Sequence, residues 1–117
     1  MESLKKFLIN SFAQMPCIEG MKDNKLLLVT AAGTIYGTLV TSVGDTVDTV
    51  NLLTSASERM ASTYCEKNGI SHNFFLDGND GYIPLKDVTI RNGNTESTMP
   101  FLCVFYDQII GISLAGL

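Results

Sequence analysis

The chain has 117 residues, of which 45% are hydrophobic and 17% are charged. These values are typical of one globular domain with a real core, and they exclude an intrinsically disordered chain. The formal net charge is −4, and only two of the eight basic residues are arginine. No stripe of basic residues is present that could replace the counterions of phosphate groups. The excess of acidic over basic residues therefore disfavours nucleic acid and anionic membranes as partners.

The first sixteen residues predict an amphipathic helix. Leu4, Leu8, Phe12 and Met15 recur at helical spacing and form one apolar stripe. Pro16 is expected to end the helix, because the residue before a proline avoids the α conformation. We expect this helix to close one end of a β-domain or to pack against another subunit.

Most of the remaining chain predicts short strands. They cover residues 25–31, 34–43, 47–54, 73–76, 82–85, 88–90, 101–106 and 109–114. Ala32-Gly33 supplies a tight turn in which glycine takes a positive φ at low cost. Gly37 lies inside the second strand and predicts a bulge or bend there. The last two strands are expected to form a closing hairpin that turns at Asp107-Gln108.

Residues 55–69 allow two interpretations. Ser55 and Glu58 have the spacing of a capping box, and Asn68-Gly69 is typical of a helix stop. The Ser, Thr and Tyr residues between them tolerate either state, so the segment could also continue the strand before it. We favour a short helix or loop.

Together these elements predict a mainly β protein, a small and strongly bent β-barrel with an N-terminal α-helix and a C-terminal hairpin. We expect a single domain over residues 1–117, with the helix in residues 1–16, the barrel strands in residues 25–91 and the hairpin in residues 99–115. The core is expected to consist of apolar side chains on these strands, namely Leu26, Leu28, Ile35, Leu39, Leu52, Ile83, Leu85, Val88, Ile90, Val104 and Ile112.

This layout resembles the Sm-like small barrels, and SH3-like and PRC-type barrels share its strand pattern. Residues 27–39 are similar to the start of the Sm-like first motif, which has a strand, a turn glycine and then Gly-x-Leu. Asp45 and the pair Asn51-Leu52 resemble the downstream Asp and Asn-Leu of that motif, although both come a few residues later. The resemblance implies a barrel fold.

The second Sm-like motif, Ile-Arg-Gly-x-x-Ile/Val, corresponds to residues 83–88. Pro84 and Leu85 stand here in place of its Arg and Gly. In the RNA-binding relatives this Arg-Gly and the Asn of the first motif help to form the nucleotide pocket. The residues to which the resemblance points for RNA binding are Asn51, Asp45, Lys86 and Arg91.

For each residue that could catalyse a reaction or bind a metal, the sequence favours a structural role over a functional one. Residues 77–81 resemble a calcium loop, but their glycine comes one residue early and Val88 stands where the loop needs Glu, so we expect a turn. His72 is the only histidine, and a metal site built on a pair of histidines cannot form. Three cysteines without short spacings predict neither a disulfide framework nor a zinc site, and we interpret them as structural. They are Cys17, Cys65 and Cys103.

The sequence contains no nucleophile elbow, Walker loop or dinucleotide-binding motif, and we expect neither catalysis nor a cofactor. Consecutive apolar residues at 26–29, 74–76 and 109–110 predict strands that a helix or another subunit covers on the second face. We therefore expect a non-catalytic protein-interaction or structural module that associates with itself or with another protein. No signal peptide or membrane span is apparent, which predicts a cytoplasmic location. The alternatives are an Sm-like RNA-binding ring and a small-molecule sensor with its ligand at the barrel mouth.

Overall fold

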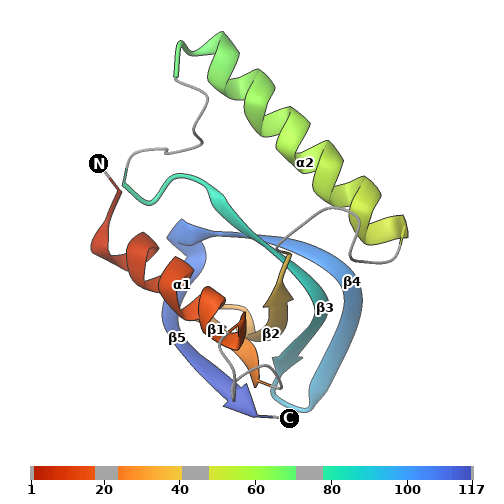
Figure 1. Ribbon diagram of the computed structural model, residues 1–117. Coiled ribbons are helices and arrows are strands. Elements are labelled where there is room, and N and C mark those ends of the chain that lie inside the picture. Colours follow the sequence, from red (N-terminus) through yellow and green to blue (C-terminus); the bar gives the residue numbers. More distant parts are fainter. Residues whose placement is uncertain (1, 18–23, 41–47, 71–77, 117) are drawn as a thin grey trace.

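The computed structural model describes residues 2–17, 24–40, 48–70 and 78–116, and within them the chain forms one five-stranded antiparallel sheet and two α-helices (Figure 1). The elements are α1 (Leu4–Gln14), a 3-10 turn (Met15–Cys17), β1 (Asn24–Thr30), β2 (Gly33–Leu39), α2 (Asp48–Lys67), β3 (Tyr82–Asn92), β4 (Thr95–Phe105), a 3-10 turn (Tyr106–Gln108) and β5 (Ile109–Gly116). The prediction of a mainly β protein is confirmed. The sheet is not closed, so the predicted barrel is not confirmed.

The N-terminal helix is confirmed as α1. Its first turn is capped by Ser3, whose hydroxyl accepts a hydrogen bond of 3.1 Å from the Lys6 backbone N–H. The face that α1 buries consists of Lys6, Ile9 and Ala13, which follow one another at helical spacing. These side chains bring α1 against β2 and β5.

The predicted apolar stripe on α1 is only partly right. Phe12 packs against the core, whereas Leu4 and Leu8 are exposed to solvent. The helix has two apolar faces, and its own periodicity does not say which one meets the sheet. The small side chain of Ala13 permits a close approach to the strands, which favours the observed face.

The hairpin of β1 and β2 turns where the sequence predicts. Gly33 has a φ of +138°, and a Cβ there would lie 3.2 Å from the Arg91 carbonyl carbon and closer still to its oxygen. The predicted irregularity at Gly37 is also confirmed, because the register of β2 with β3 shifts between Tyr36 and Thr38. Asp87 lies at this bulge with a φ of +51°. At Gly37 an added Cβ would approach the Leu85 Cβ to 3.1 Å, so only glycine fits at this position without displacing Leu85.

The largest error of the sequence analysis concerns residues 47–54, which were expected to form a strand. Residues 48–54 are the first two turns of α2, and Leu52, expected in the core, is 71% exposed. Both edges of β2 are already paired, one with β1 and the other with β3, so a strand made by this segment would find no partner there. The residues after this segment form a helix, and extending that helix back over residues 48–54 costs little free energy once it is nucleated.

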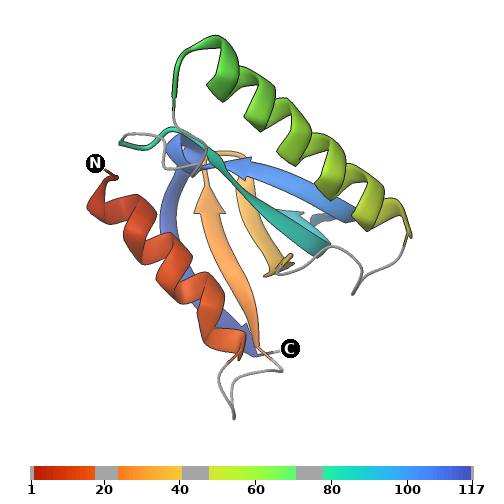
Figure 2. The same ribbon diagram turned by 45° about the horizontal axis from the view of Figure 1, so that its top comes forward.

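The helical interpretation of residues 55–69 is confirmed. α2 runs to Lys67, and the chain leaves it through Gly69, which has a φ of +67°. Val50, Thr54 and Cys65 are its buried side chains. Figure 2 shows α2 on one side of β3 and α1 on the other.

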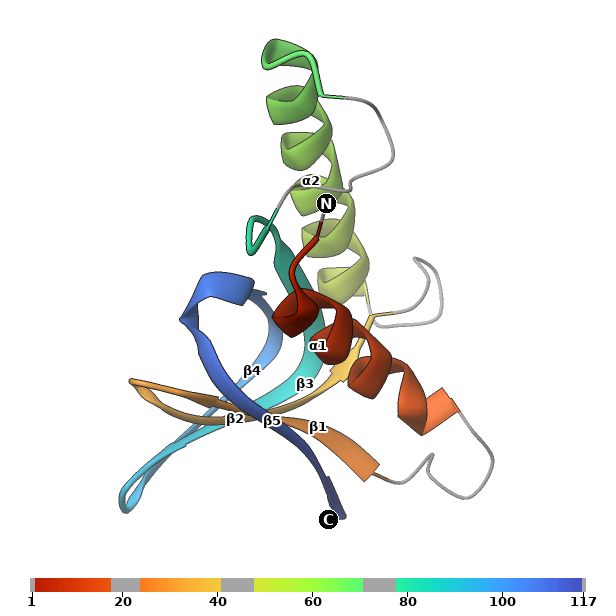
Figure 3. The same cartoon turned by 90° about the vertical axis from the view of Figure 1, so that its left-hand side faces the viewer.

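The predicted C-terminal strands exist, but they do not pair with each other. The strand order is β4-β3-β2-β1-β5, which places β4 and β5 at opposite edges of the sheet (Figure 3). The chain passes between them through the 3-10 turn Tyr106–Gln108, where the buried Tyr106 donates its backbone N–H to the Gly81 carbonyl at 3.2 Å. The predicted hairpin is therefore wrong, because this turn redirects the chain and β5 pairs with β1 instead.

The core lies between the strongly curved strands and α1. Most of the predicted core residues are confirmed, since Leu26, Leu28, Ile35, Ile83, Leu85, Val88 and Val104 are buried. Leu39, Ile90 and Ile112 are partly buried and pack against them. The two strands predicted over residues 82–85 and 88–90 form the single strand β3. The strand predicted over residues 73–76 lies outside the described residues.

Candidate functional site

A cavity of about 720 Å³ lies between α1, α2 and the end of the sheet at which β3 begins and β4 ends. Each neighbouring element contributes side chains to its wall, and so does the short segment before β3. Apolar and aromatic side chains make up much of this wall. The aromatic residues that line it are Tyr64, Tyr82, Phe105 and Tyr106.

Two of these rings are held against each other by the sheet. Tyr82 on β3 is the register partner of Phe105 on β4, and their rings meet edge to face with centroids 6.4 Å apart. Tyr64 on α2 and Phe105 are 53% and 58% exposed. The cavity therefore presents aromatic surface to solvent at its wall.

Lys6 and Tyr106 both line the cavity, and they join α1 to the sheet. The Tyr106 hydroxyl donates a hydrogen bond of 2.9 Å to Asn10 Oδ1. Lys6 is only 5% exposed, and its Nζ donates to the Asp80 carbonyl at 2.6 Å. The same ammonium lies 5.3 Å from the centroid of the Tyr106 ring, a distance at which the ring attracts a cation.

Two carboxylates line the cavity near the tyrosines. Burial raises the pKa of Tyr82 above its ordinary value, and the negative charge of Glu58 raises this pKa further. Burial likewise raises the pKa of Tyr106, to which Glu2 contributes in the same direction. Both phenols are therefore held in the neutral form, each within electrostatic reach of a carboxylate.

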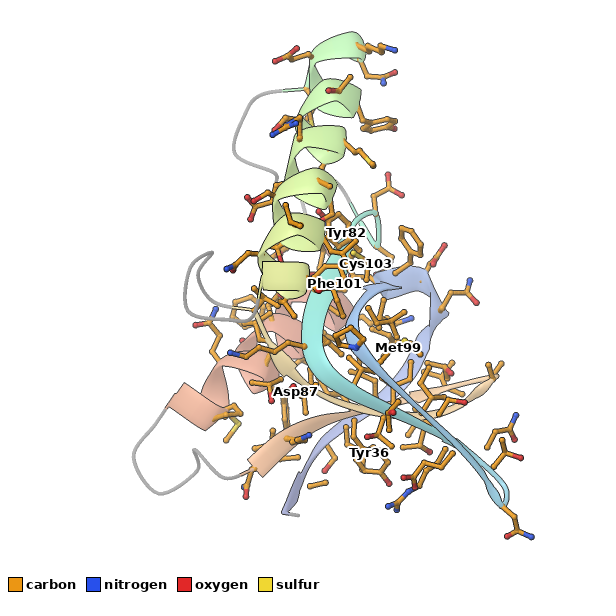
Figure 4. The ribbon with its side chains drawn as sticks, turned by 90° about the vertical axis from the view of Figure 1, so that its right-hand side faces the viewer. Tyr36, Tyr82, Asp87, Met99, Phe101 and Cys103 are labelled. Carbon is orange, nitrogen blue, oxygen red and sulfur yellow. The ribbon has the colours of Figure 1, made fainter. Side chains whose placement is uncertain are left out.

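Ser57 connects α2 to the sheet beside the cavity. Its hydroxyl donates a hydrogen bond of 2.9 Å to the Thr54 carbonyl and partly offsets the burial that raises the pKa of Tyr82 and of Cys103, which lie close together on β3 and β4 (Figure 4). Burial raises the pKa of the Cys103 thiol, so this cysteine is a poor nucleophile. Cys65 is buried in α2. The structure supports the interpretation of these two cysteines as packing residues, and Cys17 ends the first 3-10 turn.

Of the residues to which the resemblance pointed for RNA binding, one lies on α2, whereas Lys86 and Arg91 both lie on β3. Asn51 is in the first turn of α2, Lys86 is in the middle of β3, and Asp45 lies outside the described residues. Arg91 is near the turn between β3 and β4, which Figures 1 and 3 place at the end of the sheet away from α2. Its Nε is paired with Glu96 at 2.8 Å. The RNA site stays a prediction.

Metal binding and membrane insertion receive no support from the described residues. In this part of the chain no group of three or more His, Cys, Asp and Glu side chains is placed to hold a metal ion. His72 lies outside it, and of the predicted turn over residues 77–81 the structure describes residues 78–81. No described helix is long and apolar enough to cross a membrane.

The outer edges of the sheet are a second candidate site. Within the described residues, no strand pairs with the outer edge of β4 or of β5. β5 has the sequence Ile-Ile-Gly-Ile-Ser-Leu-Ala-Gly, without a charged residue or a proline. β4 carries Glu96 and Pro100 in its first part, whereas residues 101–105 are uncharged.

Sequence reasoning missed the cavity. Lys6, Tyr64, Tyr82 and Tyr106 received no role there. Three of the four tyrosines of the chain line this one cavity, which is the only hint that the sequence contains. Comparisons of the chain with models of protein families, with curated proteins and with solved structures gave no match.

Proposed function

We propose that this protein is a non-catalytic structural or interaction module that associates with copies of itself through the edges of its sheet. The observation that carries this proposal is the outer edge of β5. The cytoplasmic location expected from the sequence is part of the same proposal. The N-terminal helix and the five antiparallel strands support the resemblance to Sm-like barrels, although α2 stands between β2 and β3.

An unpaired edge strand presents a row of backbone donors and acceptors to other chains. Proteins normally block such an edge with lysine, proline or a covering element. β5 has neither residue over its eight positions, and Ile110 on it is 72% exposed. Its edge is therefore suited to pair with another strand.

The occupant that we favour for this edge is β4 of a second copy. Residues 101–105 of β4 are uncharged, and they belong to the strand that forms the opposite edge of the sheet. A contact between two different edges is heterologous, so it extends into a ring or a filament rather than a two-fold dimer. Such an assembly would leave no strand edge unpaired except at the ends of a filament.

The test is the mass in solution, measured by light scattering on a sizing column. We expect the native protein to have a multiple of the chain mass of 12.7 kDa. The double variant Ile110→Lys/Ser113→Lys places two charges on β5 and should elute at the mass of one chain. Thr63→Lys adds a charge to an exposed position of α2 and serves as the control. A native protein that is monomeric at high concentration would refute the proposal, and so would a folded double variant with unchanged mass.

A small-molecule sensor is a second candidate function, which the cavity between α1, α2 and the sheet favours. Its volume of about 720 Å³ falls within the range of sites for small ligands, roughly 300–1,000 Å³. A ligand that binds only the native state raises the melting temperature. A thermal-shift screen of small metabolites therefore tests this candidate. RNA binding is less well supported, because Arg91 is paired with Glu96 and lies away from α2.

A further inference from the structure

We propose that the cavity between α1, α2 and the sheet binds an organic cation with an apolar body, such as an arylalkylammonium. This inference rests on the second candidate function, the small-molecule sensor. It does not require self-association, because the described residues that line the cavity all belong to one copy of the chain.

The shape and surface of the cavity define the apolar part of the ligand. Rings from both helical and strand elements meet there, and two of them, Tyr64 and Phe105, remain more than half exposed. Covering exposed aromatic surface with an apolar group removes it from water, which favours binding. A ligand with an aryl or alkyl body can lie against both rings.

The charges around the cavity define the polar part. Among the residues that the structure describes, one basic residue lines the cavity against three acidic residues, namely Glu2, Glu58 and Asp80. That basic residue, Lys6, already donates to the Asp80 carbonyl and lies over the Tyr106 ring. The formal charge of the lining is therefore negative, and it favours a cation over an anion.

The structure contains a precedent for a cation in this cavity. The Lys6 ammonium is buried there between a backbone carbonyl and an aromatic face. Aromatic faces attract cations most strongly when water is excluded. Tyr82 has an aromatic ring with the Glu58 carboxylate nearby, so this pair can attract a cation on the side of the cavity toward α2.

The experiment compares three probes that share a phenethyl group and differ in charge. Phenethylammonium is the cation, 2-phenylethanol the neutral probe and 3-phenylpropanoate the anion, and their dissociation constants are measured by calorimetry or by NMR titration. We expect the cation to bind at least about fivefold more tightly than either of the other two. Shifts should concentrate in the signals of the tyrosine rings that line the cavity.

Two matched variants assign the charge selectivity to the cavity. Glu58→Gln removes a carboxylate from the lining and should weaken phenethylammonium binding at least about threefold while leaving 2-phenylethanol unchanged. Glu66→Gln makes the same change on the exposed side of α2, outside the lining, and should change neither affinity. Both positions are exposed on a helix, so both variants should fold.

Three results would overturn the inference. Equal affinity for cation and anion, or an unchanged cation affinity in Glu58→Gln, would show that the carboxylates do not select the ligand. In either case binding of 2-phenylethanol would leave the sensor proposal standing. No binding of any probe to the folded native protein at millimolar concentration would refute this inference, and the thermal-shift screen of metabolites then decides the sensor proposal separately.

Discussion

Replacing Gly33 by alanine tests the turn between β1 and β2, on which the centre of the sheet depends. Gly33 is the first residue of β2, and its φ of +138° lies in a region that residues with a side chain rarely adopt. An alanine Cβ would also overlap the Arg91 carbonyl oxygen of β3. The backbone of two strands would have to separate to make room.

The expected loss of stability in Gly33→Ala is the sum of two effects, the unfavourable φ and the clash with the Arg91 carbonyl oxygen. An unfavourable φ of this kind costs about 1–3 kcal/mol, and a clash with rigid backbone adds to it, so we expect a loss of about 3 kcal/mol or more. Gly93→Ala is the matched control, since Gly93 also has a positive φ of +62° but an added Cβ there would meet no atom within 4 Å. The control should lose only about 1 kcal/mol.

Urea denaturation followed by circular dichroism measures both losses. With a slope of roughly 1–3 kcal/mol per molar urea, a loss of about 3 kcal/mol in Gly33→Ala should lower the unfolding midpoint by about 1–3 M. Because small domains have total stabilities of about 5–15 kcal/mol, the variant should still fold at low temperature. Equal losses in Gly33→Ala and Gly93→Ala would refute the argument that the Arg91 carbonyl excludes a side chain at Gly33.

Three further predictions concern polar groups. The Thr54 hydroxyl is buried without a hydrogen-bond partner among the described residues, so Thr54→Val should raise the free energy of unfolding by about 1 kcal/mol, measured by the urea midpoint. Tyr106→Phe removes the hydrogen bond to Asn10 and should lower it by about 1 kcal/mol in the same assay. The pKa of Tyr82 is raised in the native state from 10.0, so the unfolded chain loses its phenolic proton first. The contribution of Tyr82 to stability is therefore retained below pH 10 and falls as the pH rises through 10. Urea unfolding at pH 9 and at pH 10.5 measures this decline, and Tyr82→Phe should make it shallower. An unchanged decline in that variant would contradict the assignment.

The elements that were predicted correctly depend on neighbours in the sequence. The helix α1 ends at Gln14, two residues before Pro16, and α2 ends at Lys67, two residues before Gly69 with its positive φ. The turn before Gly33 and the bulge at Gly37 likewise follow from the conformational freedom of a glycine at a single position. Such signals act within a few residues and are readable from the chain alone.

The site was not predictable in the same way. The cavity combines Lys6, Tyr64, Tyr82 and Phe105, whose separations in the chain range from about twenty to about a hundred residues. No local pattern links an aromatic residue on a helix to one on a strand edge. The burial of Lys6 itself depends on a carbonyl at Asp80, which only the folded chain brings near.

The sequence by itself determined that this protein is mainly β, begins with a helix and contains a β1–β2 turn at Gly33, because periodicity and turn residues act locally. Only the tertiary structure decided that residues 48–54 join α2, since both edges of β2 are occupied by other strands. It also decided that β5 pairs with β1 rather than with β4, which leaves two open edges among the described strands and creates the cavity beside the turn at Tyr106. The physical reason is the same in each case, because strand partners and buried faces are chosen by contacts between distant segments, whose free energy no single segment encodes.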